Sequence, residues 1–194
     1  RGPAGRTGCP SPDARHGEEG AATEFQAVPV ERAVEIVRAW ALHTWPMTAD
    51  EGVEVYTGLG FTPRPEDRTF FTSDMSPREA DSFLVIEGNL VGEVSLRLSN
   101  WVPEEDWEHS LPKSRAAFDE YARAYTELLG ESFSSEDEGT DFSRRWILDT
   151  KVMVELAGNE AFVELSVDSP EGTGDFLREL EMEERGEPID QDYF

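Results

Sequence analysis

The chain has 194 residues, and its 42 acidic against 17 basic side chains give a formal net charge of −25 at pH 7. A field this negative repels nucleic acid phosphates and anionic lipid heads and attracts cationic surfaces, so we expect neither nucleic acid nor a membrane as partner. Cys9 is the only cysteine, which excludes an intramolecular disulfide, and no run of about 18 apolar residues could span a membrane. The default expectation is a cytoplasmic protein.

Composition divides the chain into three parts. Residues 1–28 are rich in Gly, Ala, Pro and Arg without hydrophobic periodicity, so they are predicted to be disordered. Residues 29–185 alternate between apolar stripes and turn signals and are predicted to form a single domain. Residues 186–194 are predicted to form an acidic C-terminal tail. Almost all of the net charge lies outside residues 1–28.

The first half of the domain is predicted to hold two helices and three strands. Apolar residues at three-and-four spacing indicate a helix over 31–43. Thr48 and Glu51 have the spacing of a capping box, which opens a second, shorter helix. Alternating apolar residues then predict strands at 69–72, 82–87 and 91–98.

The second half is predicted to begin with the longest helix, over 112–129. Pro112 suits the first turn of this helix, and Gly130 suits its end. An acidic loop is predicted from Glu131 to Asp141. The remaining predicted elements are strands at 145–149, 151–156 and 161–167 and a last helix at 173–184.

The predicted order of elements is α-α-β-β-β-α-β-β-β-α. Antiparallel hairpins with helices to one side are typical of an α+β fold, so we expect a largely antiparallel sheet of five to six strands packed by helices. The longest helix carries an apolar stripe that is compatible with packing inside the domain or across a homodimer. The stripe consists of Phe118, Tyr121, Ala122, Tyr125, Leu128 and Leu129.

No motif for catalysis or cofactor binding is present. The three histidines are far apart, and the sequence contains no HExxH or CxxC spacing for a metal. It also lacks a GxSxG nucleophile elbow and a glycine-rich phosphate loop. The sequence therefore predicts no catalytic residue, no metal and no cofactor, and an enzyme of unfamiliar type is the least favoured alternative.

Two acidic segments are candidate partner-binding sites. In the first, two tryptophans flank three acids between strand 91–98 and the longest helix, and the second is the acidic loop. Tryptophan supplies contact area, and acids steer the encounter with a basic partner. The competing explanation is that the indoles fold back over the sheet edge while the acids serve solubility or a halophilic host. The candidate residues are Trp101, Glu104, Glu105, Asp106, Trp107, Glu136, Asp137, Glu138 and Asp141.

The order of elements from residue 31 to residue 184 resembles that of the class I type III secretion chaperones. The likeness is carried by the helix that ends in Leu-Leu-Gly at 128–130, the strand around Trp146 and the hairpin over 152–167. The chain is also similar to uncharacterised actinobacterial domains in which a WPMT-like helix start, here 45–48, precedes an LGF-like end, here 59–61. The first resemblance implies an acidic, dimeric secretion chaperone, and the second implies an immunity protein that accompanies a secreted toxin.

Both resemblances imply a non-enzymatic protein that binds another protein. We therefore expect a basic protein partner, either a toxin or a secreted effector. The alternative from the charge alone is an inhibitor that mimics nucleic acid and binds a basic protein.

Overall fold

The computed structural model describes residues 23–186. Their fold is α+β, with one antiparallel sheet of eight strands and four α-helices, so the predicted class is confirmed and the predicted five to six strands are too few. Residues 1–22 of the segment predicted to be disordered, and the predicted tail from residue 187 onward, lie outside the described part. Between residues 23 and 186, no helix has both the length and the apolar character needed to cross a bilayer.

Residues 23–28, which precede the predicted start of the domain at residue 29, pack against it. The Val28 backbone N–H donates to Leu98 O at 2.8 Å, and Ala27 forms a β-bridge with Ser99. The Phe25 side chain is buried in the core. Residues 23–28 therefore belong to the domain, because they pair with the end of a strand and contribute an aromatic ring to the core.

The first two helices form where periodicity and capping predict them. α1 (Val30–Ala41) buries its apolar face, including Ile36 and Trp40. α2 (Ala49–Gly58) opens with the predicted capping box, in which the Thr48 hydroxyl accepts from the Glu51 backbone N–H and the Glu51 carboxylate accepts from the Thr48 backbone N–H. This reciprocal pairing satisfies backbone donors that the first helical turn leaves free.

The longest helix starts earlier than predicted. A 3-10 turn, η1 (Glu104–Asp106), runs directly into α3 (Trp107–Leu129), so Pro112 lies inside the helix rather than in its first turn. The apolar stripe packs within the domain: Tyr125 is fully buried, and its hydroxyl donates to the Ala33 carbonyl of α1 at 3.1 Å. Packing of α3 against α1 and the sheet therefore accounts for most of the stripe.

The sheet consists of two antiparallel meanders joined at their last strands. The strands are β1 (Thr62–Pro63), β2 (Phe70–Thr72), β3 (Ser82–Glu87), β4 (Leu90–Arg97), β5 (Ser134–Glu138), β6 (Asp141–Ile147), β7 (Met153–Gly158) and β8 (Val163–Asp168). Their spatial order is β1-β2-β3-β4-β8-β7-β6-β5. After β4, the chain passes through α3 to the far edge and returns strand by strand, so β8 pairs with β4.

Residues 134–138 of the predicted acidic loop form a strand. β5 pairs antiparallel with β6 through a tight turn at Gly139, and Asp141 already belongs to β6. The sequence Ser-Ser-Glu-Asp-Glu has low strand propensity, and β5 forms because β6 supplies the backbone partners. Charged side chains on such an edge strand also hinder pairing with other chains.

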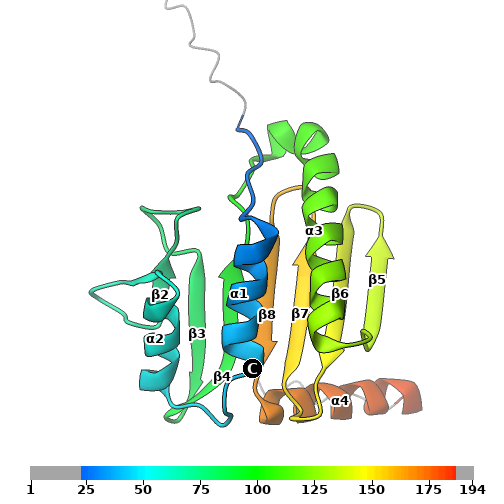
Figure 1. The fold of residues 1–194 in the computed structure, drawn as a ribbon. Coiled ribbons are helices and arrows are strands. Elements are labelled where there is room, and N and C mark those ends of the chain that lie inside the picture. Colours follow the sequence, from blue (N-terminus) through cyan, green and yellow to red (C-terminus); the bar gives the residue numbers. More distant parts are fainter. Residues whose placement is uncertain (1–22, 187–194) are drawn as a thin grey trace, which may run out of the picture.

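α1 and α3 lie over the same face of the sheet (Figure 1). The core between them and the sheet includes the fully buried Leu96, Leu165 and Leu156, one from each of the three central strands. α4 (Pro170–Arg185) crosses one end of the strands (Figure 1). Its Phe176 ring centroid lies 5.5 Å from the guanidinium carbon of Arg145 on β6. We call the face opposite α1 and α3 the open face, because α4 covers only this end of it.

Candidate functional site

The open face brings together polar side chains from strands far apart in the sequence. The register aligns Glu93 with Asp168 and Arg97 with Glu164 across β4 and β8, and Glu155 with Arg145 across β7 and β6. Each of these residues alternates with a core residue along its strand, so the core itself fixes the side to which they point. The half-buried polar residues at the centre of the open face are Glu93, Ser95, Arg97, Arg145, Glu155, Glu164, Ser166 and Asp168.

Two arginines neutralise only part of this acidic surface. Arg145, whose side chain is 19% exposed, contacts Glu136 at 2.7 Å and Glu155 at 2.8 Å. Arg97 lies farther from its partner, with 3.6 Å between its Nε and a Glu164 carboxylate oxygen. Within residues 23–186, Glu93 and Asp168 form no ion pair. The open face therefore carries more carboxylates than its two arginines pair with.

Partial burial makes several of these carboxyl groups harder to ionise. Burial, with a smaller contribution from the charges of Glu93 and Glu155, raises the pKa of Asp168 to about 7. The pKa values of Glu93 and Glu164 are also raised, in both cases first by burial and then by a neighbouring carboxylate, while Arg97 opposes the shift at Glu164. A cation arriving at this surface would restore a favourable charge balance.

A cavity of about 290 Å³ lies on the open face over β6, β7 and the start of β8; we call it the acidic trough. Small residues of neighbouring strands, Ser143, Ala157 and Gly158, lie beneath it, and Phe162 lines it toward β8. Among the described residues that line it, Arg145 is the only basic one. The carboxylates that line the trough are Glu136, Glu138, Asp141, Glu155 and Glu164.

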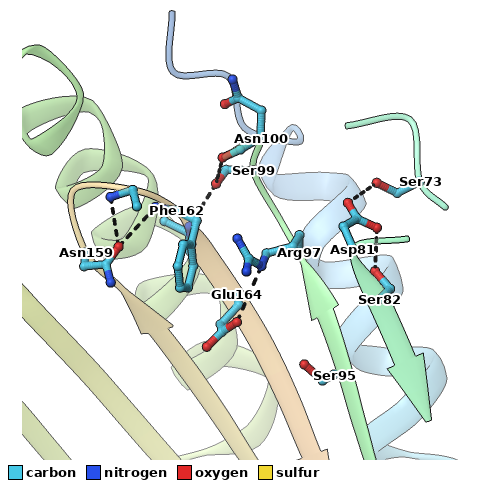
Figure 2. Close-up of polar contacts among 12 residues, drawn as sticks. Ser73, Asp81, Ser82, Ser95, Arg97, Ser99, Asn100, Asn159, Phe162 and Glu164 are labelled. Carbon is cyan, nitrogen blue, oxygen red and sulfur yellow. Dashed lines mark hydrogen bonds and ion pairs between the residues drawn. The ribbon is translucent and has the colours of Figure 1, made fainter. Parts of the chain in front are cut away.

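Phe162 is held in place on both sides. Its backbone N–H and that of Ala161 donate to the Asn159 side-chain oxygen, at 3.2 Å and 2.9 Å, which fixes the turn before β8. The Arg97 guanidinium carbon lies 3.7 Å from the Phe162 ring centroid, with the Glu164 carboxylate beside it (Figure 2). Arg97 and Phe162 thus form a ridge at the border of the trough.

A second cavity, of about 460 Å³, is lined by Arg97, Trp101 and Asp81. The Ser73 and Ser82 hydroxyls donate to the Asp81 carboxylate at 2.6 Å and 3.0 Å (Figure 2). Burial raises the pKa of Asp81, and these two hydrogen bonds oppose the rise. Arg97 lines this cavity while Phe162 lines the trough, so the ridge lies between the two cavities.

The first predicted segment is divided by the fold. Trp101 is 57% exposed and lines the second cavity, as a partner-binding side chain would. Trp107 instead packs against the core, and its indole N–H donates to the Val102 carbonyl at 2.9 Å. Glu104 and Glu105 are exposed on η1, whereas Asp106 accepts a hydrogen bond from the Thr23 backbone N–H at 2.7 Å.

The second predicted segment is divided between the two faces of the sheet. Asp137 points to the helix side, where Arg115 of α3 donates two hydrogen bonds of 2.8 Å to its carboxylate. Glu136, Glu138 and Asp141 line the trough instead. Since β8, β7 and β6 separate β4 from β5, the structure does not join the two predicted segments into one patch.

Sequence reasoning missed the residues at the centre of the open face. The signal was present in the alternation of Glu93, Ser95 and Arg97 with apolar residues, which reads as an ordinary solvent-facing side of a strand. Nothing in the sequence says that β4 and β8 are neighbours. Without that pairing, Arg97 and Glu164 cannot be assigned to one site.

The part of the chain that the structure describes contains no group of three or more His, Cys, Asp or Glu side chains arranged to hold a metal ion.

Comparison with known proteins places the chain in one family. Residues 31–169, more than half of the chain, match the model of a family of unknown function, DUF6301, and the chain belongs to that family. The match extends from α1 to the residue after β8 and so includes the whole sheet. No curated protein and no solved structure matches the chain.

Proposed function

We propose that this member of the DUF6301 family is a non-enzymatic protein that binds a basic partner protein through the open face of its sheet. The observation that carries the proposal is the excess of half-buried carboxylates on that face, of which Glu93 and Asp168 have no ion-pair partner within residues 23–186. A partner that brings arginine or lysine to this surface would neutralise them.

The energetics favour a cationic partner. A carboxyl group with a raised pKa releases its proton when a positive charge arrives beside it, because the cation stabilises the ionised form. The net charge of −25 adds a long-range attraction that speeds encounter with a basic protein and weakens as salt is added. The open face thus contributes both the site and part of the field that guides the partner to it.

The structure supports catalysis less well than it supports binding of a partner protein. Asp168, whose pKa of about 7 would suit a general acid or base, lines neither the acidic trough nor the second cavity. Among the described carboxyl groups, the one with the largest shift in pKa therefore lies outside both of these cavities.

The resemblance to secretion chaperones and immunity domains narrows the class of partner. Both kinds of protein hold one cognate protein, a secreted effector or a toxin, and a toxin that acts on nucleic acid has a basic cleft complementary to an acidic sheet. We therefore propose a toxin or an effector with a basic surface as the partner. The mimicry alternative makes a different prediction, because competing DNA would then displace the protein from its partner.

The test compares two double variants of the full chain as bait in an extract of the source organism. Glu138→Gln with Glu164→Gln removes two of the five carboxylates that line the trough, and Glu179→Gln with Glu183→Gln removes the same charge from the exposed side of α4. We expect a basic protein to be retained by the wild type and the α4 variant, and lost with the trough variant. With that protein purified, its association rate should fall steeply with salt. Equal retention by both variants would contradict the proposal.

A further inference from the structure

We infer that the acidic trough receives the guanidinium group of one arginine side chain from the basic partner. The inference rests on the proposed function, since it names the group of the partner that the open face recognises. Four features of the trough support the inference: its size, its charge, the unpartnered hydroxyl of Ser143 and the aromatic ring of Phe162.

The trough has room for a side chain and not for a cofactor. Its volume of about 290 Å³ lies just below the range for ligand pockets, about 300–1,000 Å³. Ala157 on β7 keeps the space above the sheet free, because its methyl group is too short to fill it. A partner backbone lying over the open face could therefore place one long side chain there.

The charge of the trough is unbalanced. Arg145 already holds Glu136 and Glu155 at ion-pair distance. Within residues 23–186, Glu138 and Asp141 form no ion pair, and Glu164 has only the 3.6 Å contact with Arg97. These three carboxylates are available to a cation that enters the trough.

Ser143 provides an observation independent of the acids. Ser143 is 8% exposed and lines the trough, and its buried hydroxyl has no hydrogen-bond partner among the described residues. A buried hydroxyl without a partner is unfavourable, so such a group in a native structure calls for an explanation. An N–H donor that enters the trough and reaches Ser143 would supply the missing hydrogen bond.

The aromatic wall favours guanidinium over ammonium. Phe162 already stacks with one guanidinium, that of Arg97, at 3.7 Å from the ring centroid, and it borders the trough as well. A guanidinium is planar, stacks on aromatic rings and donates to two acceptors at once, whereas an ammonium is a compact and strongly hydrated charge. Carboxylates, a hydroxyl acceptor and an aromatic ring in one small space therefore match arginine better than lysine.

The test uses a minimal probe, N-acetyl-arginine N′-methylamide, which carries a guanidinium and no other charge. The matching lysine compound keeps the positive charge without the planar guanidinium, and the matching citrulline compound keeps the planar shape without the charge. Each is titrated into the full chain and followed by changes in the backbone amide signals of Ala157 and Gly158. We expect saturable changes with the arginine probe, at least about fivefold weaker binding of the lysine probe, and no saturation with citrulline.

Variants of the protein locate the binding site. Ser143→Ala should weaken binding of the arginine probe about fivefold, and Glu138→Gln with Glu164→Gln should weaken it about tenfold or more. Ser95→Ala is the matched control, because Ser95 lies on the open face outside the lining of the trough (Figure 2). Unfolding curves establish that each variant remains folded.

Absence of saturation by the arginine probe would overturn the inference, as would equal affinity for the lysine probe or signal changes confined to the second cavity. If the extract experiment yields a basic partner that needs Glu138 and Glu164 but the arginine probe does not bind, the proposed function stands and this inference fails. If the probe binds but the extract yields no basic protein, the trough recognises a small guanidinium compound instead. The proposed function is then wrong, and so is the inference that the guanidinium belongs to a partner protein.

Discussion

Replacing Asp168 with asparagine should stabilise the protein at neutral pH and not at acidic pH. The carboxyl group of Asp168 faces Glu93 on β4 and lies near Glu155 of β7 and Arg145 of β6. Burial, aided by the two glutamates, raises its pKa from the ordinary 3.8 to about 7. A carboxyl group with a raised pKa binds a proton more tightly in the folded state than in the unfolded state, so its contribution to stability falls as the pH rises from about 4 to about 7.

The size of the effect follows from the shift in pKa. Each pH unit between the two pKa values is worth about 1.4 kcal/mol, so the ionised group costs the folded state at most about 4 kcal/mol above pH 7. At pH 5 only part of this cost is present. Asp168→Asn keeps the shape of the side chain without the titration, and its free energy of unfolding relative to the wild type should rise by about 2–3 kcal/mol between pH 5 and pH 8.

Urea unfolding followed by tryptophan fluorescence at the two pH values measures this change, since Trp40 and Trp146 are fully buried. Glu179→Gln, on the exposed side of α4, controls for the removal of one negative charge from a chain of net charge −25. Its difference from the wild type should change little between pH 5 and pH 8. If Asp168→Asn behaves like this control, the surroundings of Asp168 do not destabilise its ionised form. A cation that binds the open face would then gain no stabilisation from this carboxyl group.

Two further substitutions examine the packing that supports the open face. A Cβ at Gly158 would lie 2.4 Å from the buried Phe142 ring. Gly158→Ala should therefore lower the free energy of unfolding, measured in urea, by about 1–3 kcal/mol. An unchanged urea midpoint would mean that the Phe142 ring can move aside. Tyr125→Phe removes the buried hydrogen bond that links α3 to the Ala33 carbonyl of α1, which should lower the free energy of unfolding by about 0.5–1.5 kcal/mol. An unchanged stability in thermal unfolding would mean that this bond adds nothing beyond the packing of the ring.

Much of the fold could be predicted because its signals are local. The α1 stripe, the Thr48 capping box and the alternation along β4 each depend on residues within a few positions of one another. The errors arose where tertiary contacts decide. A proline usually marks the first turn of a helix, but α3 follows η1 and begins at Trp107, five residues before Pro112. Residues 134–138 have the composition of a loop and become a strand because β6 pairs with them.

The candidate site was predicted in part for the same physical reason. Exposed Trp101 and the acids of the second segment are recognisable by residue type, and the structure places Trp101, Glu136, Glu138 and Asp141 beside cavities. The burial of Trp107 depends on how α3 docks against residues near Val102, which its local sequence does not encode. The centre of the open face depends on the pairing of β4 with β8, which are more than 60 residues apart in the chain.

The acids of β5 show how one run of like charges can serve two purposes. Asp137 faces α3, where its two hydrogen bonds with Arg115 hold the edge strand against the helix. Glu138, one position later, faces the other side of the sheet and lines the trough without an ion pair among the described residues. Because side chains alternate along a strand, adjacent acids are committed to opposite faces. The charge of the segment therefore divides into a share already used by the fold and a share that remains available to a partner.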